Sequence, residues 1–329
     1  CAGSVKLEGA IAQNLLMDLK PYIDENGLEA QVGANYEQNQ VDGKIYTVSI
    51  GLASIGMWVN TDVLEATGAT MPEEWTTWEA FADAMETVRV NGEAMGYYSY
   101  GSGQGSIRMF NAALAATPAG AEMLKGPLTA DAINSEEFAD AFRTVATLDQ
   151  QNGSANSSVN ANDFAADFNN GLSAVFINGV WGASQFAGSD NFVSCIYPNS
   201  VAISSANTGL YVANDLSDAQ KELALEFIKY MTSEEVQSRY FLETSSNPIN
   251  ENVDIQKLAQ ESGDPTALKL AEACDKCNKA DTIVLAIDVC WGNDVGGALQ
   301  NKFAECAVAG TDIEAKLAEL QAELTALIG

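Results

Sequence analysis

A tryptophan that directly follows a short apolar segment is the side chain best placed to bind a ligand. Residues 173–177 include Ala, Val, Phe and Ile, which favours a buried strand. Asn178-Gly179-Val180-Trp181 comes next. Because ligands lie outside the carboxyl ends of strands in open α/β sheets, we expect the Trp181 ring, with Asn178 and Gly179 beside it, to form a binding surface. The alternative is a purely structural Trp181 in the core.

Cysteine spacing suggests a second kind of chemistry. Cys274-Asp-Lys-Cys277 could bind zinc together with Cys290 and Cys306, although the spacing matches a zinc ribbon only in part. Cys274 and Cys277 are also one helical turn apart on a predicted helix. We therefore expect structural cysteines, either buried thiols or a disulfide such as Cys277 to Cys290, and no metal site.

Catalysis by the common triads is excluded by composition. The 329 residues contain no histidine, so Ser-His-Asp and Cys-His mechanisms cannot operate within this chain. Asp163 and Asp167 could suggest the carboxylate pair of a glycoside hydrolase. Among 45 acidic residues such pairs arise by chance, and these two are one helical turn apart. We expect no catalytic residue, no cofactor and no enzymatic activity.

Charge and hydrophobicity limit the partners. Sixteen Lys and Arg face 45 Asp and Glu, which gives a net charge of −29. Phosphate groups repel such a chain, so we do not expect nucleic acid or anionic membrane surfaces as partners. A hydrophobic content of 47% is typical of a folded protein, and no apolar run reaches the roughly eighteen residues of a membrane-spanning helix.

Strand-like and helix-like segments alternate along the chain, which predicts an α/β fold. A Ser or Thr followed three residues later by Glu or Gln predicts capping boxes at Thr76, Ser217 and Thr311. Trp75 and Trp78 flank the first of these helix starts. We interpret both rings as structural.

Four segments in order resemble the maltose-binding-like group of extracellular solute-binding proteins, which supply sugars to ABC importers. The segments are DGKIY with GLASIGMWVNTDVLEATG (42–46 and 51–68), PEEWTTW (72–78), FNNGLSAVFINGVWG (168–182) and ALEFIKYMTSEEVQSRYFLETSSNP (224–248). The resemblance implies an α/β clamshell of the type II periplasmic-binding-protein kind. Each lobe would be a mixed sheet flanked by helices, and three hinge crossings would join the lobes.

The resemblance also suggests where the lobes begin and end. Lobe 1 is expected at residues 1–50 and 210–285, and lobe 2 at 55–205 and 290–329, with crossings at 50–55, 205–210 and 285–290. The family's first βαβ unit has no counterpart here, so we expect a truncated N-terminus. Cys1 is then better interpreted as the end of an internal strand than as a lipid anchor.

A sugar pocket needs aromatic rings for the apolar face of a pyranose and polar groups for its hydroxyls. By resemblance, Trp181 is the expected stacking ring, and Trp291 near the third crossing is a second candidate, with core packing as its alternative. Further candidates come from both lobes: Ser54, Tyr98, Tyr100, Gln104, Asn293 and Lys6.

The expected function is that of an extracytoplasmic substrate-binding subunit. It would capture a mono- or oligosaccharide as a monomer and deliver it to ABC permease subunits, and the full-length protein would be lipid-anchored. The alternatives are a binding protein for a non-sugar solute and a secreted carbohydrate-active enzyme.

Overall fold

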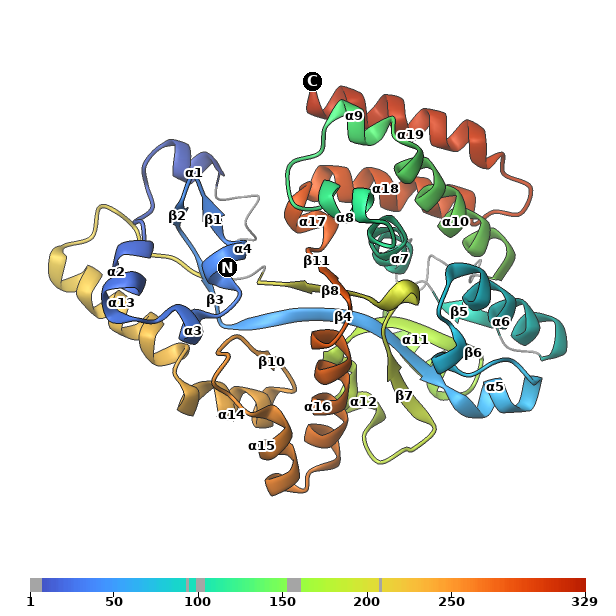
Figure 1. The fold of residues 1–329 in the computed structure, drawn as a ribbon, viewed down its shortest axis with the longest axis horizontal. Helices are drawn as coiled ribbons and strands as arrows, with labels where there is room; N and C mark the ends of the chain where they lie inside the picture. The colour runs from blue at the N-terminus through green and yellow to red at the C-terminus, as the bar shows by residue number, and fades with distance from the viewer. Residues whose placement is uncertain (1–7, 93–94, 99–103, 153–160, 207–208) are drawn as a thin grey trace. The chain divides into compact units, whose positions relative to one another are not determined.

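The computed structural model describes residues 8–92, 95–98, 104–152, 161–206 and 209–329 (Figure 1). The chain divides into two compact units. Unit 1 comprises Cys1–Ser54, Ala183–Ala187 and Ser204–Cys274, and unit 2 comprises Ile55–Gly182, Gly188–Ile203 and Asp275–Gly329. The last passage between units follows Cys274, whereas the sequence placed it in residues 285–290. The hinge role of the crossings stays a prediction.

Unit 1 contains short strands and helices around a small core. Its elements are α1 (Glu8–Ala12), α2 (Lys20–Asn26), α3 (Glu29–Val32), α4 (Asn35–Gln38), β1 (Gln40–Val41), β2 (Lys44–Ile45), β3 (Val48–Ser49), α12 (Ala183–Phe186), β9 (Gly209–Leu210), α13 (Asp218–Met231), α14 (Glu234–Thr244), β10 (Asn247–Pro248) and α15 (Ile255–Ser262). β1 pairs with β2 and β3 with β9, both antiparallel. Ile23, Val32 and Ile45 are among the residues of the core, which α13 completes with Leu225 and Ile228.

Three elements run from one unit into the other at the crossings, and one of them is β8 (Val201–Ser205), whose last two residues belong to unit 1. β4 (Gly51–Asn60) begins in unit 1, where Leu52 pairs with Asn247 of β10, and continues as a strand of unit 2. α16 (Pro265–Asn278) begins in unit 1 and ends in unit 2. α15 ends before Gly263, which has φ +63°, and α16 begins at Pro265. A Gly-Asp-Pro sequence favours such an interruption between two helices.

A mixed sheet forms the centre of unit 2. Its strands, in spatial order, are β11 (Thr282–Val284), β8 (Val201–Ser205), β4, β6 (Ser173–Gly179) and β5 (Met95–Tyr98), and β7 (Phe192–Cys195) also pairs with β4. β5 is parallel to β6 and β11 is parallel to β8, whereas β6 and β7 are antiparallel to β4. Parallel and antiparallel pairs in one sheet, with helices between the strands in sequence, confirm the expected α/β class.

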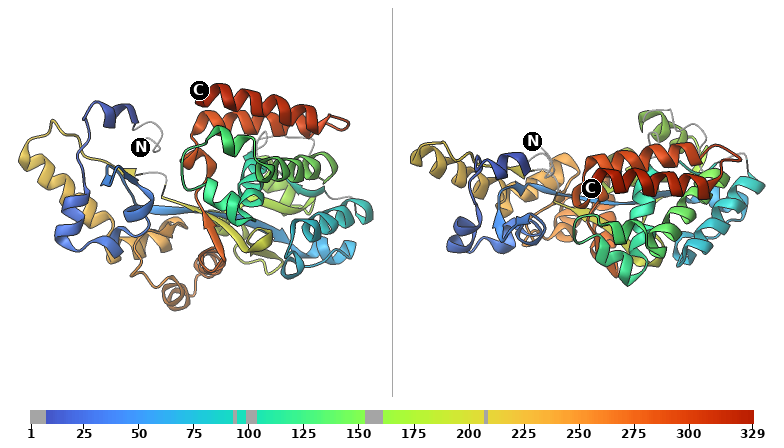
Figure 2. Two further views of the ribbon diagram at one scale, coloured as in Figure 1. Left: turned by 45° about the horizontal axis from the view of Figure 1, so that its top comes forward. Right: turned by 90° about the horizontal axis from the view of Figure 1, so that it is seen from above.

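Helices cover this sheet. They are α5 (Thr61–Thr67), α6 (Trp78–Asn91), α7 (Gln104–Ala115), α8 (Pro118–Met123), α9 (Ala130–Ile133), α10 (Glu136–Asn152), α11 (Ala161–Asn169), α17 (Ile287–Cys290), α18 (Asn293–Cys306) and α19 (Ile313–Ile328). α10, α18 and α19 lie side by side (Figure 2). Stacked rings join α10 to α18, since the Phe142 and Phe303 centroids are 4.9 Å apart. The described residues include no helix that is both long and apolar enough to cross a membrane.

The helix caps test the capping predictions. Ser217 and Gln220 form the predicted capping box at the start of α13. At α6 and α19 the predicted cap is wrong by one residue. Thr77 Oγ1 accepts from the Ala80 amide at 3.2 Å, and Asp312 Oδ1 accepts from the Ala315 amide at 3.1 Å. Thr77 and Asp312 are also residue types that favour the N-cap position. The sequence alone therefore does not decide between Thr76 and Thr77, or between Thr311 and Asp312.

Candidate functional site

The turn that follows β6 brings the predicted binding residues together. Gly179 ends β6 and pairs with Ile55, the residue at which β4 enters unit 2. Val180–Gly182 then forms a single 3-10 turn that contains Trp181. Trp181 therefore follows the carboxyl end of a buried strand, as the sequence predicts.

The Trp181 ring rests on the backbone of Gly179. A Cβ atom placed on Gly179 would overlap the Cε3, Cζ3 and Cη2 atoms of the indole, so only glycine lets the ring lie this close. Trp181 nevertheless keeps 41% of its surface exposed. An aromatic ring supported by backbone on one side and exposed elsewhere is suited to stacking against an apolar ligand face.

A buried tryptophan on the neighbouring strand holds this turn in place. Trp58, only 1% exposed, donates its Nε1–H to the Gly179 carbonyl oxygen at 2.9 Å. A Cβ atom on Gly182 would lie 2.5 Å from the same nitrogen, so Gly182 also needs to be glycine. The Asn178 Oδ1 atom accepts from the Gly179 amide at 2.9 Å and orders the turn further. Sequence reasoning missed Trp58, because only the tertiary structure shows that its side chain reaches the Gly179 carbonyl although its backbone pairs with Phe176.

Two other predicted site residues lie in structural surroundings. The Ser54 side chain is fully buried in unit 1, where its hydroxyl accepts from Asn247 Nδ2 at 2.9 Å and lies 3.2 Å from Ser204 Oγ. Trp291 is 7% exposed, stacks on Phe138 and donates to the Met123 carbonyl at 3.2 Å. Side chains enclosed in this way offer little surface to a sugar, and their binding roles stay untested predictions.

The remaining predicted residues are less enclosed or fall outside what can be described. Asn293 is exposed at the first position of α18, after Gly292, which has φ +92°. Tyr98 ends β5 and Gln104 begins α7, but the described structure does not extend to their side chains. Tyr100 and Lys6 lie outside the described residues.

An ion pair that the sequence did not reveal joins α7 to α17. The Arg108 guanidinium donates to the Asp288 carboxylate, and both side chains are partly buried. Close by, Asn111 donates to the Leu285 carbonyl at 3.1 Å and accepts from the Ile287 amide at 2.9 Å. These contacts fix the segment between β11 and α17.

The cysteines in the described part of the chain are buried or half-buried thiols. Cys277 and Cys290 are both free, so the suggested disulfide between them is not formed. Burial raises the pKa of Cys195, Cys277 and Cys290 to about 12 and that of Cys306 to about 11. Thiols of this kind stay protonated at neutral pH and are poor nucleophiles and metal ligands. No group of three or more Asp, Glu, Cys or His among the described residues could hold a metal ion.

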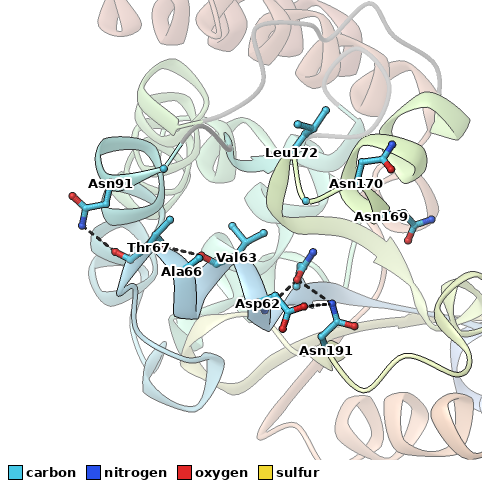
Figure 3. A pocket seen from close by; sticks show the side chains of 12 residues that line it. Asp62, Val63, Ala66, Thr67, Asn91, Asn169, Asn170, Leu172 and Asn191 are labelled. Carbon is cyan, nitrogen blue, oxygen red and sulfur yellow. Dashed lines mark hydrogen bonds between the residues drawn. The ribbon is translucent and has the colours of Figure 1, made fainter.

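A hollow of about 600 Å³ opens on unit 2 where β4 ends (Figure 3). It lies around Asn60, which is five residues, or about 17 Å at 3.3 Å per residue, along the strand from Ile55, the residue that pairs with Gly179. Its lining includes five asparagines and one carboxylate. The sequence analysis did not single out this pocket, because its lining comes from four separate segments.

Comparison with known proteins agrees with the resemblance seen in the sequence. Residues 4–266 match the family described as bacterial extracellular solute-binding protein. A Streptococcus pneumoniae solute-binding protein, solved in complex with the blood group A-trisaccharide, is 41% identical with a TM-score of 0.90, over 97% of this chain and 81% of that one. No curated protein matches this chain.

More distant solved structures share the fold. The sugar-binding protein MalE of Xanthomonas citri is 17% identical with a TM-score of 0.78, over 99% of this chain and 82% of that chain. A chitin oligosaccharide binding protein is 20% identical with the same TM-score, over 98% and 81% of the two chains. The family match covers most of the chain, so this protein belongs to the bacterial extracellular solute-binding proteins.

Proposed function

We propose that this protein is the substrate-binding subunit of an ABC importer and that it captures an oligosaccharide reversibly outside the cytoplasm. The observation that carries the proposal is the Trp181 ring, which is supported by Gly179 and 41% exposed after the carboxyl end of β6. The 41% identical neighbour was solved with a trisaccharide, which supports an oligosaccharide ligand here.

Capture in this proposal is a conformational equilibrium. The sugar binds one relative arrangement of the two units more tightly, and crossings between the units act as hinges. ABC permease subunits then recognise the liganded form. A monomeric state and lipid anchoring of the full-length protein belong to the same proposal.

Isothermal titration calorimetry with the blood group A-trisaccharide, raffinose and chitin oligosaccharides tests the proposal. We expect binding of at least one sugar, with affinity reduced at least tenfold in Trp181→Ala, because the variant loses the apolar area that the ring buries and a further stacking contribution of about 0.5–1.5 kcal/mol. Phe227→Ala is the matched control, since Phe227 is an aromatic ring of α13 that is 50% exposed. It should bind with unchanged affinity.

Recovery of the sugar distinguishes a binding protein from an enzyme. We expect chromatography to return the bound oligosaccharide intact after prolonged incubation. Cleavage products would favour the carbohydrate-active enzyme instead. Absence of heat with every sugar, together with no change in thermal midpoint, would overturn the carbohydrate assignment. A sugar at a hundred times its dissociation constant should stabilise the protein by about 2.7 kcal/mol.

A further inference from the structure

The open pocket at the end of β4 is built from four segments of unit 2. β4 ends there at Asn60 and α5 begins, while the last residues of α6, the turn between α11 and β6, and Asn191 before β7 complete the lining. Figure 3 shows their side chains around one hollow. All four segments belong to unit 2. Every described residue of the lining therefore comes from that one unit.

The turn after α11 holds an apolar side chain at this pocket. Gly171, with φ +74°, donates its amide to the Phe168 carbonyl at 3.0 Å, and the Leu172 amide donates to the Asp167 carbonyl at 2.9 Å. This pair of bonds is a Schellman motif, which fixes the backbone at the end of the helix. Leu172 remains 47% exposed, and a Cβ atom on Gly171 would be only 3.7 Å from Val63 Cγ2. Leu172 and Val63 thus provide apolar surface on rigid backbone.

The wall at the start of α5 is polar and held in place by its own hydrogen bonds. Asn60, 4% exposed, accepts from the Asp62 amide at 3.2 Å and from Asn191 Nδ2 at 3.4 Å. Asn191 Nδ2 also donates to Asp62 Oδ2 at 2.9 Å. The other carboxylate oxygen, Asp62 Oδ1, accepts no hydrogen bond from any described residue. It is available to a ligand hydroxyl.

The remaining amides add donors and acceptors. Asn91 Nδ2 donates to the Thr67 carbonyl at 3.0 Å, which orients the side chain and leaves Oδ1 available. The side-chain amides of Asn169 and Asn170 are exposed and have no hydrogen-bond partner within the described part of the chain. The pocket lining therefore offers a ligand both hydrogen-bond donors and hydrogen-bond acceptors that have no partner among the described residues.

The chemistry of the lining selects one ligand class. Asp62 is the only charged residue among the described residues that line the pocket, so an anion finds no cation to pair with. One carboxylate is also fewer than a calcium or magnesium site normally provides. A hydroxyl group both donates and accepts, as a side-chain amide does, and a pyranose adds an apolar C–H face that suits Leu172.

We propose that this pocket is a second ligand site that takes a single neutral sugar ring, separate from the Trp181 turn. The apolar face of the ring lies against Leu172. Its hydroxyls donate to Asp62 Oδ1 and exchange hydrogen bonds with the amides of Asn169 and Asn170. Because the pocket is open and none of the described residues that line it is aromatic, we expect a dissociation constant on the order of millimolar.

Methyl NMR of the whole chain tests this site independently of the first one. The protein is labelled at Leu methyl groups and at tryptophan indoles, and it is titrated separately with D-galactose, D-glucose, D-mannose and N-acetyl-D-glucosamine. Leu172→Ile assigns the Leu172 methyl signals, and Trp181→Phe assigns the Trp181 indole signal. We expect at least one sugar to shift the Leu172 methyls with saturation. The Trp181 signal reports the proposed main site, so failure of either site is seen separately.

Matched variants identify the pocket as the cause. Asn170→Ala and Leu172→Ser should each weaken the affinity for the sugar at least threefold. Saturation transfer to the ligand measures this in both variants, and the Leu172 methyl signals measure it in Asn170→Ala as well. Asn301→Ala and Leu327→Ser are the controls, because Asn301 is exposed in α18 and Leu327 is 48% exposed in α19, both away from the pocket. They should change nothing.

Two outcomes would overturn the proposal. One is a Leu172 signal that does not move with any of the four sugars at concentrations well above ten millimolar. The other is a response equally strong in Asn170→Ala and Leu172→Ser, which would place the sugar elsewhere. Trp181→Ala should leave the Leu172 response unchanged, and its loss in that variant would also contradict two separate sites.

Discussion

Trp58 donates its indole N–H to the Gly179 carbonyl oxygen at 2.9 Å, and so a buried ring on β4 supports the exposed ring that follows β6. The two tryptophans act as a pair with different tasks. Trp58 fills the core and fixes the backbone of the turn, whereas Trp181 lies over Gly179 with 41% of its surface exposed. The position of the candidate binding ring therefore depends on a side chain that is itself buried.

Replacing Gly179 by alanine should displace the Trp181 ring. The added methyl group would overlap three indole atoms, so the ring must leave its place on the backbone. We expect at least a tenfold loss of affinity for the bound oligosaccharide and about 1–3 kcal/mol lower stability. Calorimetric titration and denaturant unfolding measure the two effects.

Gly297→Ala is the control for this change. Gly297 lies within α18, and a Cβ atom there would meet nothing within 4 Å. Because alanine favours helix more than glycine by about 1 kcal/mol, the control should be as stable as the parent or more stable, and should bind sugar normally. Normal binding by Gly179→Ala would show that the ring is not held as described.

Trp58→Phe should weaken the turn without opening a large cavity. Phenylalanine keeps most of the apolar volume but removes the donor to the Gly179 carbonyl, which is left without this buried partner. We expect about 1–3 kcal/mol lower stability and weaker sugar binding. The NMR signal of the Trp181 indole should shift as well. A stable variant with unaltered affinity would contradict the supporting role of Trp58.

Ser54→Ala should act on stability rather than on binding. The Ser54 hydroxyl accepts from Asn247 Nδ2 at 2.9 Å inside unit 1, and its loss leaves that buried amide without this acceptor. We expect about 1–3 kcal/mol lower stability in denaturant unfolding. The combined variant with Asn247→Ala should cost less than the sum of the two single changes. A large loss of sugar affinity at unchanged stability would instead assign Ser54 to the ligand.

The buried thiols should make stability fall at alkaline pH. Burial raises the pKa of Cys195 and Cys277 from an ordinary value of 9.0 to about 12. Above pH 9 the unfolded chain therefore loses protons that the folded chain keeps, so the thiols' contribution is complete below pH 9 and declines as pH rises towards 12. The slope is at most about 1.4 kcal/mol per pH unit for each thiol.

Thermal midpoints between pH 8 and 10.5 measure this effect. Other groups titrate in the same range, so the informative quantity is the difference between the parent protein and Cys277→Ala. We expect the variant to lose less stability over this interval. Parallel curves for the two proteins would show that Cys277 is not held as a protonated thiol.

Local patterns in the sequence predicted much of the fold and one part of the site. The apolar run before Asn178 predicted β6, and the capping box at Ser217 predicted the start of α13. Strand and helix periodicity depend on neighbouring residues, so they are visible without a structure. The ring that follows β6 was found for the same reason.

Long-range packing decided the rest. Trp291 and Trp181 are both followed by glycine in the sequence, yet Trp291 stacks on Phe138 in the core and Trp181 is exposed. Asn60, Leu172 and Asn191 lie far apart along the chain and meet only because β4 ends where the α11–β6 turn and the segment before β7 come together. The solvent exposure of a side chain depends on segments that are distant in the sequence. Strand register and helix packing, rather than local residue types, determine where those segments lie.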